Sequence, residues 1–279
     1  MTVRIVTDSA CDLSDEELEE WGIGLVPLSL RFGDDEFVDR TELSLESFYS
    51  KLANSEHLPE TSAPAPGAFV EMFNQMHAEG ATDVVCINLS EALSATIQSA
   101  RTAAGSDDVT IPVHVVNSKS VTGGLGSMVL AAARSAREGA SAADIVAAVE
   151  DQRDRTRVYA TLDTLENLKK GGRIGGAQAA FGAMLSIKPL LDLSSGEVVA
   201  EGKQRTRKRA LGWVRDKLAE AGDVENLAIL HSNAPDIDEF LASIADIPAA
   251  AHARTNIIGA VIGTHGGPGI IGITYQEKA

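Results

Sequence analysis

Two unbroken apolar runs constrain the fold of this chain more than any other feature of its sequence. They are DVVCINL at residues 83–89 and VHVVNS at residues 113–118, and a helical pattern that starts near Ser94 lies between them. Strands that are apolar throughout are typical of a parallel sheet that helices cover on both faces. The N-terminal half is therefore predicted to be an α/β domain built on a parallel sheet.

The alternation of strands and helices continues on both sides of these runs. The N-terminal run VRIVT precedes a helix in which Ser14 and Glu17 have the spacing of a capping box, and Pro66 lies in the first turn of another helix. After the second apolar run come two more helices, and Ser141 is placed to cap the later one. Repeated units of this kind predict a doubly wound sheet.

The C-terminal half has a different pattern. IKPLLDL and EVVAEG flank the turn residues SSG and predict a β-hairpin, and further strands are predicted at LAILHS, NIIGAVIG and GIIGITY. A mixed sheet with helices between some of its strands makes this half an α+β domain. We therefore expect two domains, residues 1–158 and 159–279, because a chain of this length exceeds the usual size of one hydrophobic core.

Composition and charge argue against several classes of function. No apolar run reaches the roughly 18 residues of a membrane span and no secretory leader is recognised, so a cytoplasmic protein is expected. The formal net charge of −16 disfavours nucleic acid as a partner and permits at most transient contact with an anionic membrane. Cys11 and Cys86 lack the spacing of metal ligands, so neither a metal site nor a disulfide framework is predicted.

Small polar residues follow the predicted parallel strands at their carboxyl ends, beyond which open sheets of this class bind ligands. They are Thr7, Asp8 and Ser9 after the first strand, the segment SEALSAT at 90–96 after the second, and Asn117 and Ser118 after the third. Ser94 is a candidate helix N-cap, where free backbone N–H groups and the helix dipole favour an anion. Each of these residues also has an ordinary role in capping helices and turns.

Three glycine-rich or proline-rich segments supply further polar groups. The loop TSAPAP holds Thr61 and Ser62, and glycine pairs flank Arg173 in LKKGGRIGG. In THGGPG, His265 lies between two predicted strands, where a histidine in a hairpin loop is commonly a solvated residue. Hydroxyls, one guanidinium and one imidazole together indicate a receptor for a carboxylate.

The sequence lacks the motifs of the common enzyme classes. It has no nucleophile elbow, no P-loop, no zinc-protease helix motif and no dinucleotide-binding glycine pattern after the first strand. A serine hydrolase that acts on acyl esters through Ser94 and His265 stays open as an alternative, because a catalytic triad is defined by geometry and not by spacing. No other catalytic residue and no cofactor is predicted.

Seven segments, in order along nearly the whole chain, carry a resemblance to the DegV family. They are VTDSACDL (6–13), TSAPAP (61–66), LSEALSATIQSA (89–100), NSKSVTGGLG (117–126), LKKGGRIGG (168–176), SIKPLLDLSSGEV (186–198) and IGTHGGPG (262–269). The family comprises the fatty-acid-binding subunits of bacterial fatty acid kinase. The chain thus resembles a lipid-binding protein more than an enzyme.

The resemblance implies a ligand and the residues that hold it. One long-chain fatty acid would lie between the N-terminal α/β domain and the C-terminal α+β domain, as a ligand and not as a cofactor. Thr61, Ser94, Arg173 and His265 would hold its carboxylate, with Ser62 beside Thr61. A separate ATP-dependent kinase would phosphorylate the bound acid to an acyl phosphate, which places the chain in phospholipid metabolism as a substrate carrier.

The chain departs from the family pattern at three positions. Ala63 stands where glutamine is common, Ala95 replaces a glycine and Asn117 replaces an aspartate. These changes bear on the preferred acyl chain and on the choice of kinase. The path of the acyl tail is left open, because the stretch at 175–191, rich in Ala and Gly, either leaves room for a chain or forms a packed helix.

A basic cluster, KQRTRKR at residues 203–209, is unusual in so acidic a chain. A helix is predicted to begin inside it, and each cation at a helix N-terminus costs about 0.3 to 1 kcal/mol. The cluster is either a solvated helix face or a surface that docks a partner. By resemblance to the family, Arg205 would contact the kinase, and Arg207 is the second residue expected to act there.

Overall fold

The strand β1 (Val3–Asp8) lies inside a four-stranded sheet with the order β2, β1, β6, β7. Its neighbours β2 (Gly24–Val26) and β6 (Asp83–Asn88) are parallel to it, and β7 (Val113–Asn117) is parallel to β6. The structure, a computed structural model, describes residues 2–55, 58–181 and 187–278. The two apolar runs therefore form the parallel strands that the sequence predicts.

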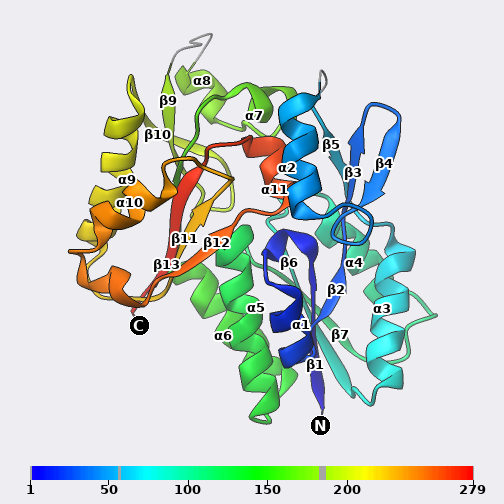
Figure 1. Ribbon diagram of the computed structural model, residues 1–279. Helices are drawn as coiled ribbons and strands as arrows, with labels where there is room; N and C mark the ends of the chain where they lie inside the picture. The colour runs from blue at the N-terminus through cyan, green and yellow to red at the C-terminus, as the bar shows by residue number, and fades with distance from the viewer. Residues whose placement is uncertain (1, 56–57, 182–186, 279) are drawn as a thin grey trace.

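Helices cover both faces of this parallel sheet (Figure 1). Ile5 and Val85 point to the layer that contains α5 (Thr122–Arg137) and α6 (Ala142–Arg155). Val6 and Val84 point the other way, to α3 (Pro66–Ala78) and α4 (Thr96–Ala104). Successive strand residues thus pack against opposite helix layers, which confirms the predicted α/β domain.

A small antiparallel sheet extends from the parallel one. Its order is β4 (Asp35–Val38), β3 (Ser29–Phe32) and β5 (Glu60–Ser62), and Leu30 of β3 pairs with Thr61 of β5. Helix α1 (Asp15–Trp21), which has the predicted capping box, precedes the β3–β4 hairpin. Helix α2 (Leu45–Asn54) follows it. The short strand β5 fixes the position of Thr61.

The C-terminal half contains a six-stranded mixed sheet in the order β10, β9, β8, β13, β11, β12. The strands are β8 (Thr156–Thr161), β9 (Lys188–Asp192), β10 (Val199–Gln204), β11 (Val224–His231), β12 (Arg254–Ile257) and β13 (Ile271–Glu277). Neighbouring strands are antiparallel except for β11 and β12. The β9–β10 hairpin forms where predicted.

The boundary between the two expected domains, placed after residue 158, stays a prediction. This position falls within β8.

One face of the mixed sheet is covered by helices and the other faces the N-terminal half. Ile229 packs with α9 (Arg207–Ala221) and α10 (Ile237–Ile244), whereas its neighbours Ala228 and Leu230 belong to the opposite face. The shorter helices α7 (Glu166–Lys170), α8 (Ala177–Phe181) and α11 (Ala260–Gly266) lie on the side of that second face (Figure 1). Within the described ranges, no helix combines the length and the apolar composition needed to cross a membrane.

The prediction of a strand over NIIGAVIG is wrong in its second half. Residues 254–257 form β12, but the chain then forms α11, and His265 lies in the last turn of that helix. A Cβ atom at Gly263 would lie 2.9 Å from Cε1 of Phe48 and 3.0 Å from the hydroxyl oxygen of Tyr49. The glycine therefore permits close packing of α11 on α2, and a short apolar run of this kind does not distinguish a buried helix from a strand.

Candidate functional site

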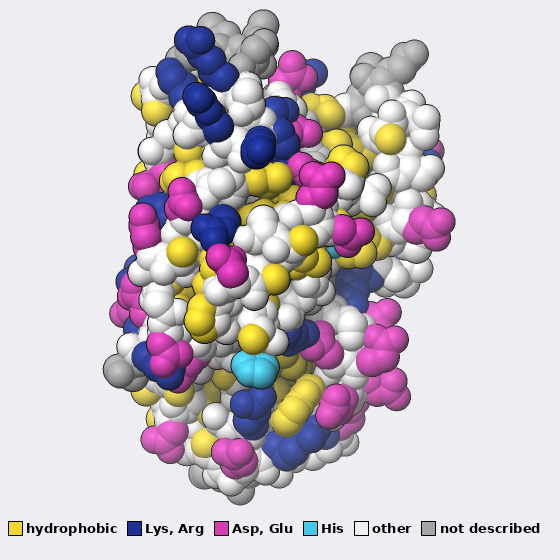
Figure 2. All heavy atoms as spheres, turned by 60° about the vertical axis from the view of Figure 1, so that its left-hand side comes forward, with side chains coloured by type: hydrophobic (Ala, Val, Ile, Leu, Met, Phe, Trp, Pro, Cys, Tyr) yellow, Lys and Arg dark blue, Asp and Glu magenta, His cyan; other side chains and the backbone are white. Residues whose placement is uncertain are grey.

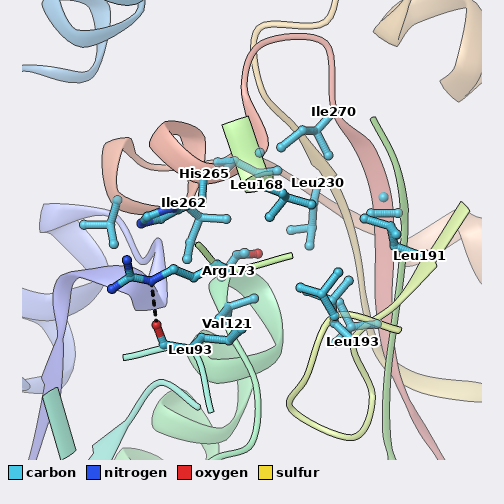
Figure 3. Close-up of a pocket in the computed structure, with 18 of the residues that line it drawn as sticks. Leu93, Val121, Leu168, Arg173, Leu191, Leu193, Leu230, Ile262, His265 and Ile270 are labelled. Atoms are coloured by element: carbon cyan, nitrogen blue, oxygen red, sulfur yellow. Dashed lines mark hydrogen bonds between the residues drawn. The ribbon is translucent and has the colours of Figure 1, made fainter. Parts of the chain in front are cut away.

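A narrow cavity lies between the mixed sheet and the N-terminal half. Its wall consists largely of Leu, Ile and Val side chains from both halves. Figure 3 shows Leu191, Leu193 and Ile270 across the cavity from Arg173. An apolar wall with a few polar groups at one end is typical of a site for a small ligand with an apolar body.

Four of the side chains predicted from the sequence line this cavity. Thr61 comes from β5, Ser94 from the loop before α4, Arg173 from the loop after α7 and His265 from α11. Thr61 Oγ1 and His265 Nε2 lie 2.8 Å apart and share a hydrogen bond. The structure thus brings residues from distant parts of the chain to one polar end of the cavity.

The guanidinium of Arg173 has no carboxylate partner among the described residues. Its Nε donates to the carbonyl oxygen of Leu93 at 3.2 Å, shown as a dashed line in Figure 3, and its Nη1 donates to the carbonyl oxygen of Gly171 at 2.7 Å. These carbonyl groups orient the side chain without neutralising its charge. A guanidinium held in this way can receive a carboxylate at the end of the cavity.

Burial and the positive charge of Arg173 together lower the pKa of His265 to about 4. The imidazole is therefore neutral at pH 7. Its Nδ1 is buried and has no hydrogen-bond partner among the described residues. A Cβ atom at position 171 would lie 2.5 Å from this nitrogen, so Gly171 provides the space in which the ring packs.

Ser94 lines the cavity, but the prediction that it caps a helix is wrong. Helix α4 begins at Thr96, and its N-cap residue is Ala95, which makes no side-chain capping bond. The chain turns once before the helix, since the N–H groups of Leu93 and Ser94 both donate to the carbonyl oxygen of Ser90. The hydroxyl oxygen of Ser94 lies 2.8 Å from Oγ1 of Thr96 and accepts the N–H of that residue at 3.3 Å.

Ser62 does not reach the cavity. It follows Thr61 in β5, and successive residues of a strand point to opposite faces, so Ser62 is exposed. Of the three positions that depart from the family pattern, Asn117 has a visible role, because its Oδ1 accepts the N–H of Lys119 at 2.9 Å. Ala63 and Ala95 also lie outside the described lining of the cavity.

The polar residues at the end of β1 support the cavity wall and do not line it, so of the two roles that the sequence leaves open they take the structural one. The buried carboxylate of Asp8 accepts the N–H of Leu89 at 2.9 Å and the side-chain amide of Asn88 at 3.1 Å. The hydroxyl of Ser9 accepts the N–H of Leu28 at 3.1 Å. Leu28 and Leu89 both line the cavity, so this loop fixes two parts of its wall.

The hydrolase alternative requires a hydrogen bond between a serine nucleophile and a histidine base. In the described part of the chain, Ser94 bonds to Thr96 and His265 bonds to Thr61. A pKa of about 4 also makes His265 a weak base. The same part of the chain holds no cluster of His, Cys, Asp or Glu suited to a metal ion. Ser94 and His265 are thus not paired as a nucleophile and its base in this structure.

The basic cluster begins helix α9 as predicted, with Thr206 as its N-cap residue. Arg207 donates from Nε and Nη2 to the two carboxylate oxygens of Asp236, both at 2.9 Å, and its Nη1 lies 3.5 Å from Asp163. These carboxylates offset the charge of Arg207 at the helix N-terminus, and Arg207 holds the pKa of Asp236 below its usual value. Arg207 is thus already paired within the chain.

Arg205 differs from Arg207. Its side chain is exposed and forms no ion pair with any residue that the structure describes. Figure 2 shows Lys and Arg side chains close together on the upper part of the face it presents. Arg205 thus has its charge uncompensated among the described residues, whereas that of Arg207 is paired; their docking role stays a prediction.

The apolar wall of the cavity was not predicted from the sequence. Leu168, Leu193 and Ile262 belong to it, and all three stand inside segments that were singled out for their polar or glycine residues. Of the stretch 175–191, Leu191 lines the cavity, whereas Ala177 and Phe181 pack in a buried cluster and residues 182–186 lie outside the described ranges. The sequence signal that could have revealed this wall is the apolar residue inside each of these segments.

Comparison with known proteins relates this arrangement to one family. The family model described as "Uncharacterised protein, DegV family" matches residues 2–278. A DegV domain-containing protein of Streptomyces coelicolor is 36% identical over 280 residues, and the match covers 99% of both chains. A DegV domain-containing protein of Halalkalibacterium halodurans is 37% identical over 283 residues, again with 99% of both chains covered.

Two solved structures resemble the whole chain. One, described as the fatty acid binding of a DegV family protein from Thermus thermophilus, has 32% identity and a TM-score of 0.89. The other, DegV of Bacillus subtilis, described as a fatty acid binding protein, has 29% identity and a TM-score of 0.88. Each comparison covers 100% of both chains, so the fold is shared from end to end.

Proposed function

The chain belongs to the DegV family, and from this premise we propose that it binds one long-chain fatty acid in the cavity between its two halves. One observation carries the proposal: an apolar cavity ends at Arg173, whose charge no carboxylate of the described residues neutralises. The fatty acid would place its carboxylate there and its tail against the leucine wall. The similar proteins of Thermus thermophilus and Bacillus subtilis, described as binding fatty acids, support this assignment.

The head group would meet three donors, and a fourth residue would orient one of them. Arg173 supplies the charge, and the hydroxyls of Thr61 and Ser94 supply hydrogen bonds. His265 is neutral and orients Thr61 through their shared hydrogen bond. Each such bond contributes only about 1 to 3 kcal/mol, so the head group fixes the position of the ligand more than its affinity.

The tail supplies most of the binding energy. At about 0.8 kcal/mol per buried methylene, a chain of about 16 carbons contributes on the order of 12 kcal/mol before the costs of association. A ligand bound this strongly dissociates slowly and should remain with the protein through purification.

The test is a native mass spectrum of the purified protein, followed by organic extraction and identification of the lipid. We expect one acyl chain per polypeptide, and we expect palmitate to raise the melting temperature of delipidated protein. Methyl palmitate, which lacks the carboxylate, should stabilise it less. Absence of a stoichiometric acyl chain together with no stabilisation by palmitate or oleate would overturn the proposal.

We further propose that the chain is not itself an enzyme but presents the fatty acid to a separate ATP-dependent kinase in the cytoplasm. A carboxylate oxygen of the bound acid would form a bond to the γ-phosphorus of ATP, while the bond from that phosphorus to the bridging oxygen breaks and ADP leaves with the electron pair. The product is an acyl phosphate, an activated acyl donor suited to phospholipid synthesis. The absence of a paired nucleophile and base in the described site supports a carrier.

A further inference from the structure

A second hollow, which we call the outer hollow, lies on the other side of the polar end of the cavity. Thr61, Arg173 and His265 line both spaces, so their side chains form the wall between them. Arg31, Glu60 and Lys170 are among the other residues of the outer hollow. The two spaces differ in character, because the inner wall is apolar and the outer hollow carries several charged groups.

The charges of the outer hollow do not balance within the chain. Arg31 forms an ion pair with Glu60 and is thereby neutralised. Arg173 donates to carbonyl groups alone, and the exposed Lys170 forms no ion pair with any described residue. Two cations without a carboxylate partner among the described residues thus line the same hollow of a chain whose formal net charge is −16. Such a pair favours an anion with more than one negative charge.

We propose that the outer hollow binds the phosphoryl group of an acyl phosphate, with Lys170 as its main contact and Arg173 shared with the acyl carbonyl group. This inference rests on the proposed function. A carboxylate carries a single negative charge that Arg173 alone can match, whereas a phosphate ester carries about −1.5 to −2 and requires a second cation. Lysine commonly serves as a point charge for phosphate.

The position of the wall determines on which side the phosphoryl group lies. The phosphorus is one bond away from a carboxyl oxygen at Thr61, Arg173 and His265, so it must enter one of the two spaces. A dianion in the apolar cavity would lose its hydration without compensation. The outer hollow offers water and a second cation, so the phosphoryl donor would also arrive from this side. The ligand class is therefore an apolar chain whose head group ends in a phosphoryl dianion.

The test compares two ligands of matched length on delipidated protein, palmitate and hexadecyl phosphate, a stable stand-in for the acyl phosphate. Affinities are measured by displacement of a fluorescent fatty acid, below the micelle threshold of each ligand. In the variant Lys170→Ala we expect about a tenfold weaker affinity for hexadecyl phosphate, equivalent to about 1.4 kcal/mol, and less than a twofold change for palmitate. Lys170→Arg should retain most of the affinity. Lys208→Ala, which removes another exposed lysine, should leave the affinity for both ligands unchanged.

Three results would count against the inference. Wild-type protein that binds palmitate but not hexadecyl phosphate would overturn it and leave fatty acid binding intact. An equal effect of Lys170→Ala on both ligands, or an effect on neither, would remove the role of Lys170 in phosphoryl recognition. Wild-type protein that binds neither ligand would overturn the proposed function and the inference with it.

Discussion

Thr61 Oγ1 and His265 Nε2 lie 2.8 Å apart although 204 positions separate the two residues in the chain. Strand β5 of the N-terminal half carries the first, and helix α11 of the C-terminal half carries the second. The polar end of the cavity is therefore assembled only when both halves are in place. A ligand that contacts both residues also ties the two halves together.

The first prediction concerns this hydrogen bond. Thr61→Val keeps the side-chain shape but removes the hydroxyl, so we expect palmitate affinity to fall about five- to tenfold, as for the loss of one hydrogen bond of about 1 to 1.4 kcal/mol. Ser62→Ala is the matched control, because its neighbouring hydroxyl is exposed and should not matter. Titration calorimetry measures the palmitate affinity of both variants. If Thr61 acts through His265, combining Thr61→Val with His265→Gln should cost less than the sum of the single effects, and simple additivity would contradict the coupling.

The second prediction concerns pH. Burial lowers the pKa of His265 to about 4, so this group stabilises the fold above its unfolded pKa of 6.5, and the contribution is lost as pH falls toward 4. We expect the unfolding free energy of wild type, relative to His265→Gln, to decrease by up to about 1.4 kcal/mol per pH unit over this window. Urea denaturation of ligand-free protein measures it.

The pH dependence must be measured as a difference between wild type and His265→Gln, because Asp8 also titrates in this range. Burial raises the pKa of Asp8 to about 6, so its contribution is present at low pH and is lost as pH rises through 6. The two residues therefore have opposite effects between about pH 4 and 6, and the wild-type curve alone would be flattened. Since Asp8 is present in both proteins, the difference isolates the imidazole. A difference that does not change with pH would contradict the burial of a neutral His265.

Local patterns were sufficient to predict much of the fold. The apolar runs of β6 and β7, the capping box of α1 and the β9–β10 hairpin depend on neighbouring residues, so the sequence shows them directly. The four polar residues of the site could be named because each stands in a motif of the family. Their meeting at one end of a cavity depends on how the two halves pack, which no local pattern contains.

The errors arose where packing between distant segments determines local structure. Gly263 was interpreted as part of a strand, but its role is to let α11 approach Phe48 of α2. Ser62 was grouped with Thr61, but the pairing of β5 with β3 sends the two side chains to opposite faces. For Asp8 the sequence left a ligand-binding role and a capping role open, and packing decides for the second, because its carboxylate accepts the N–H groups of Ala10 and Leu89.

The third prediction tests the space at position 171. In Gly171→Ala the new Cβ would lie 2.5 Å from Nδ1 of His265 and 3.0 Å from the carbonyl oxygen of Asn167, so the ring must move. We expect a loss of stability of about 1 to 3 kcal/mol, as for other overpacked sites, together with weaker palmitate binding. Gly212→Ala in helix α9 is the control, because its Cβ meets no atom within 4 Å and alanine favours a helix. Equal stability of the two variants would contradict the prediction.

The fourth prediction concerns the length of the acyl chain. Figure 3 places Leu193 across the cavity from Arg173, so Leu193→Trp should fill the space that the end of a long tail would use. The loss of contact for about four methylenes costs about 3 kcal/mol, or roughly a hundredfold in palmitate affinity. Laurate should lose much less, and Leu193→Met, which conserves volume, should change little. An equal loss for both acids would contradict the placement of Leu193 at the far end of the tail.

The last prediction separates two arginines of the basic cluster that the sequence could not distinguish. Arg207 is paired with Asp236, so Arg207→Ala should lower the unfolding free energy by about 1 kcal/mol by leaving that carboxylate without its donor. Arg205 is exposed and forms no ion pair with any described residue, so Arg205→Ala should leave stability and palmitate binding unchanged.

Arg205→Ala should instead slow the kinase reaction, because a charge at the rim of a docking surface acts mainly on the rate of association. The loss should be largest at low salt and should shrink as salt screens the charge, since the screening length falls to about 3 Å at 1 M. The measurement is the rate of acyl phosphate formation at several concentrations of wild type or variant with the cognate kinase, at low and at high salt. A variant that matches wild type at every salt concentration would show that Arg205 belongs to a solvated helix end, and a variant that fails equally at all salt concentrations would point to misfolding, which its melting temperature would reveal.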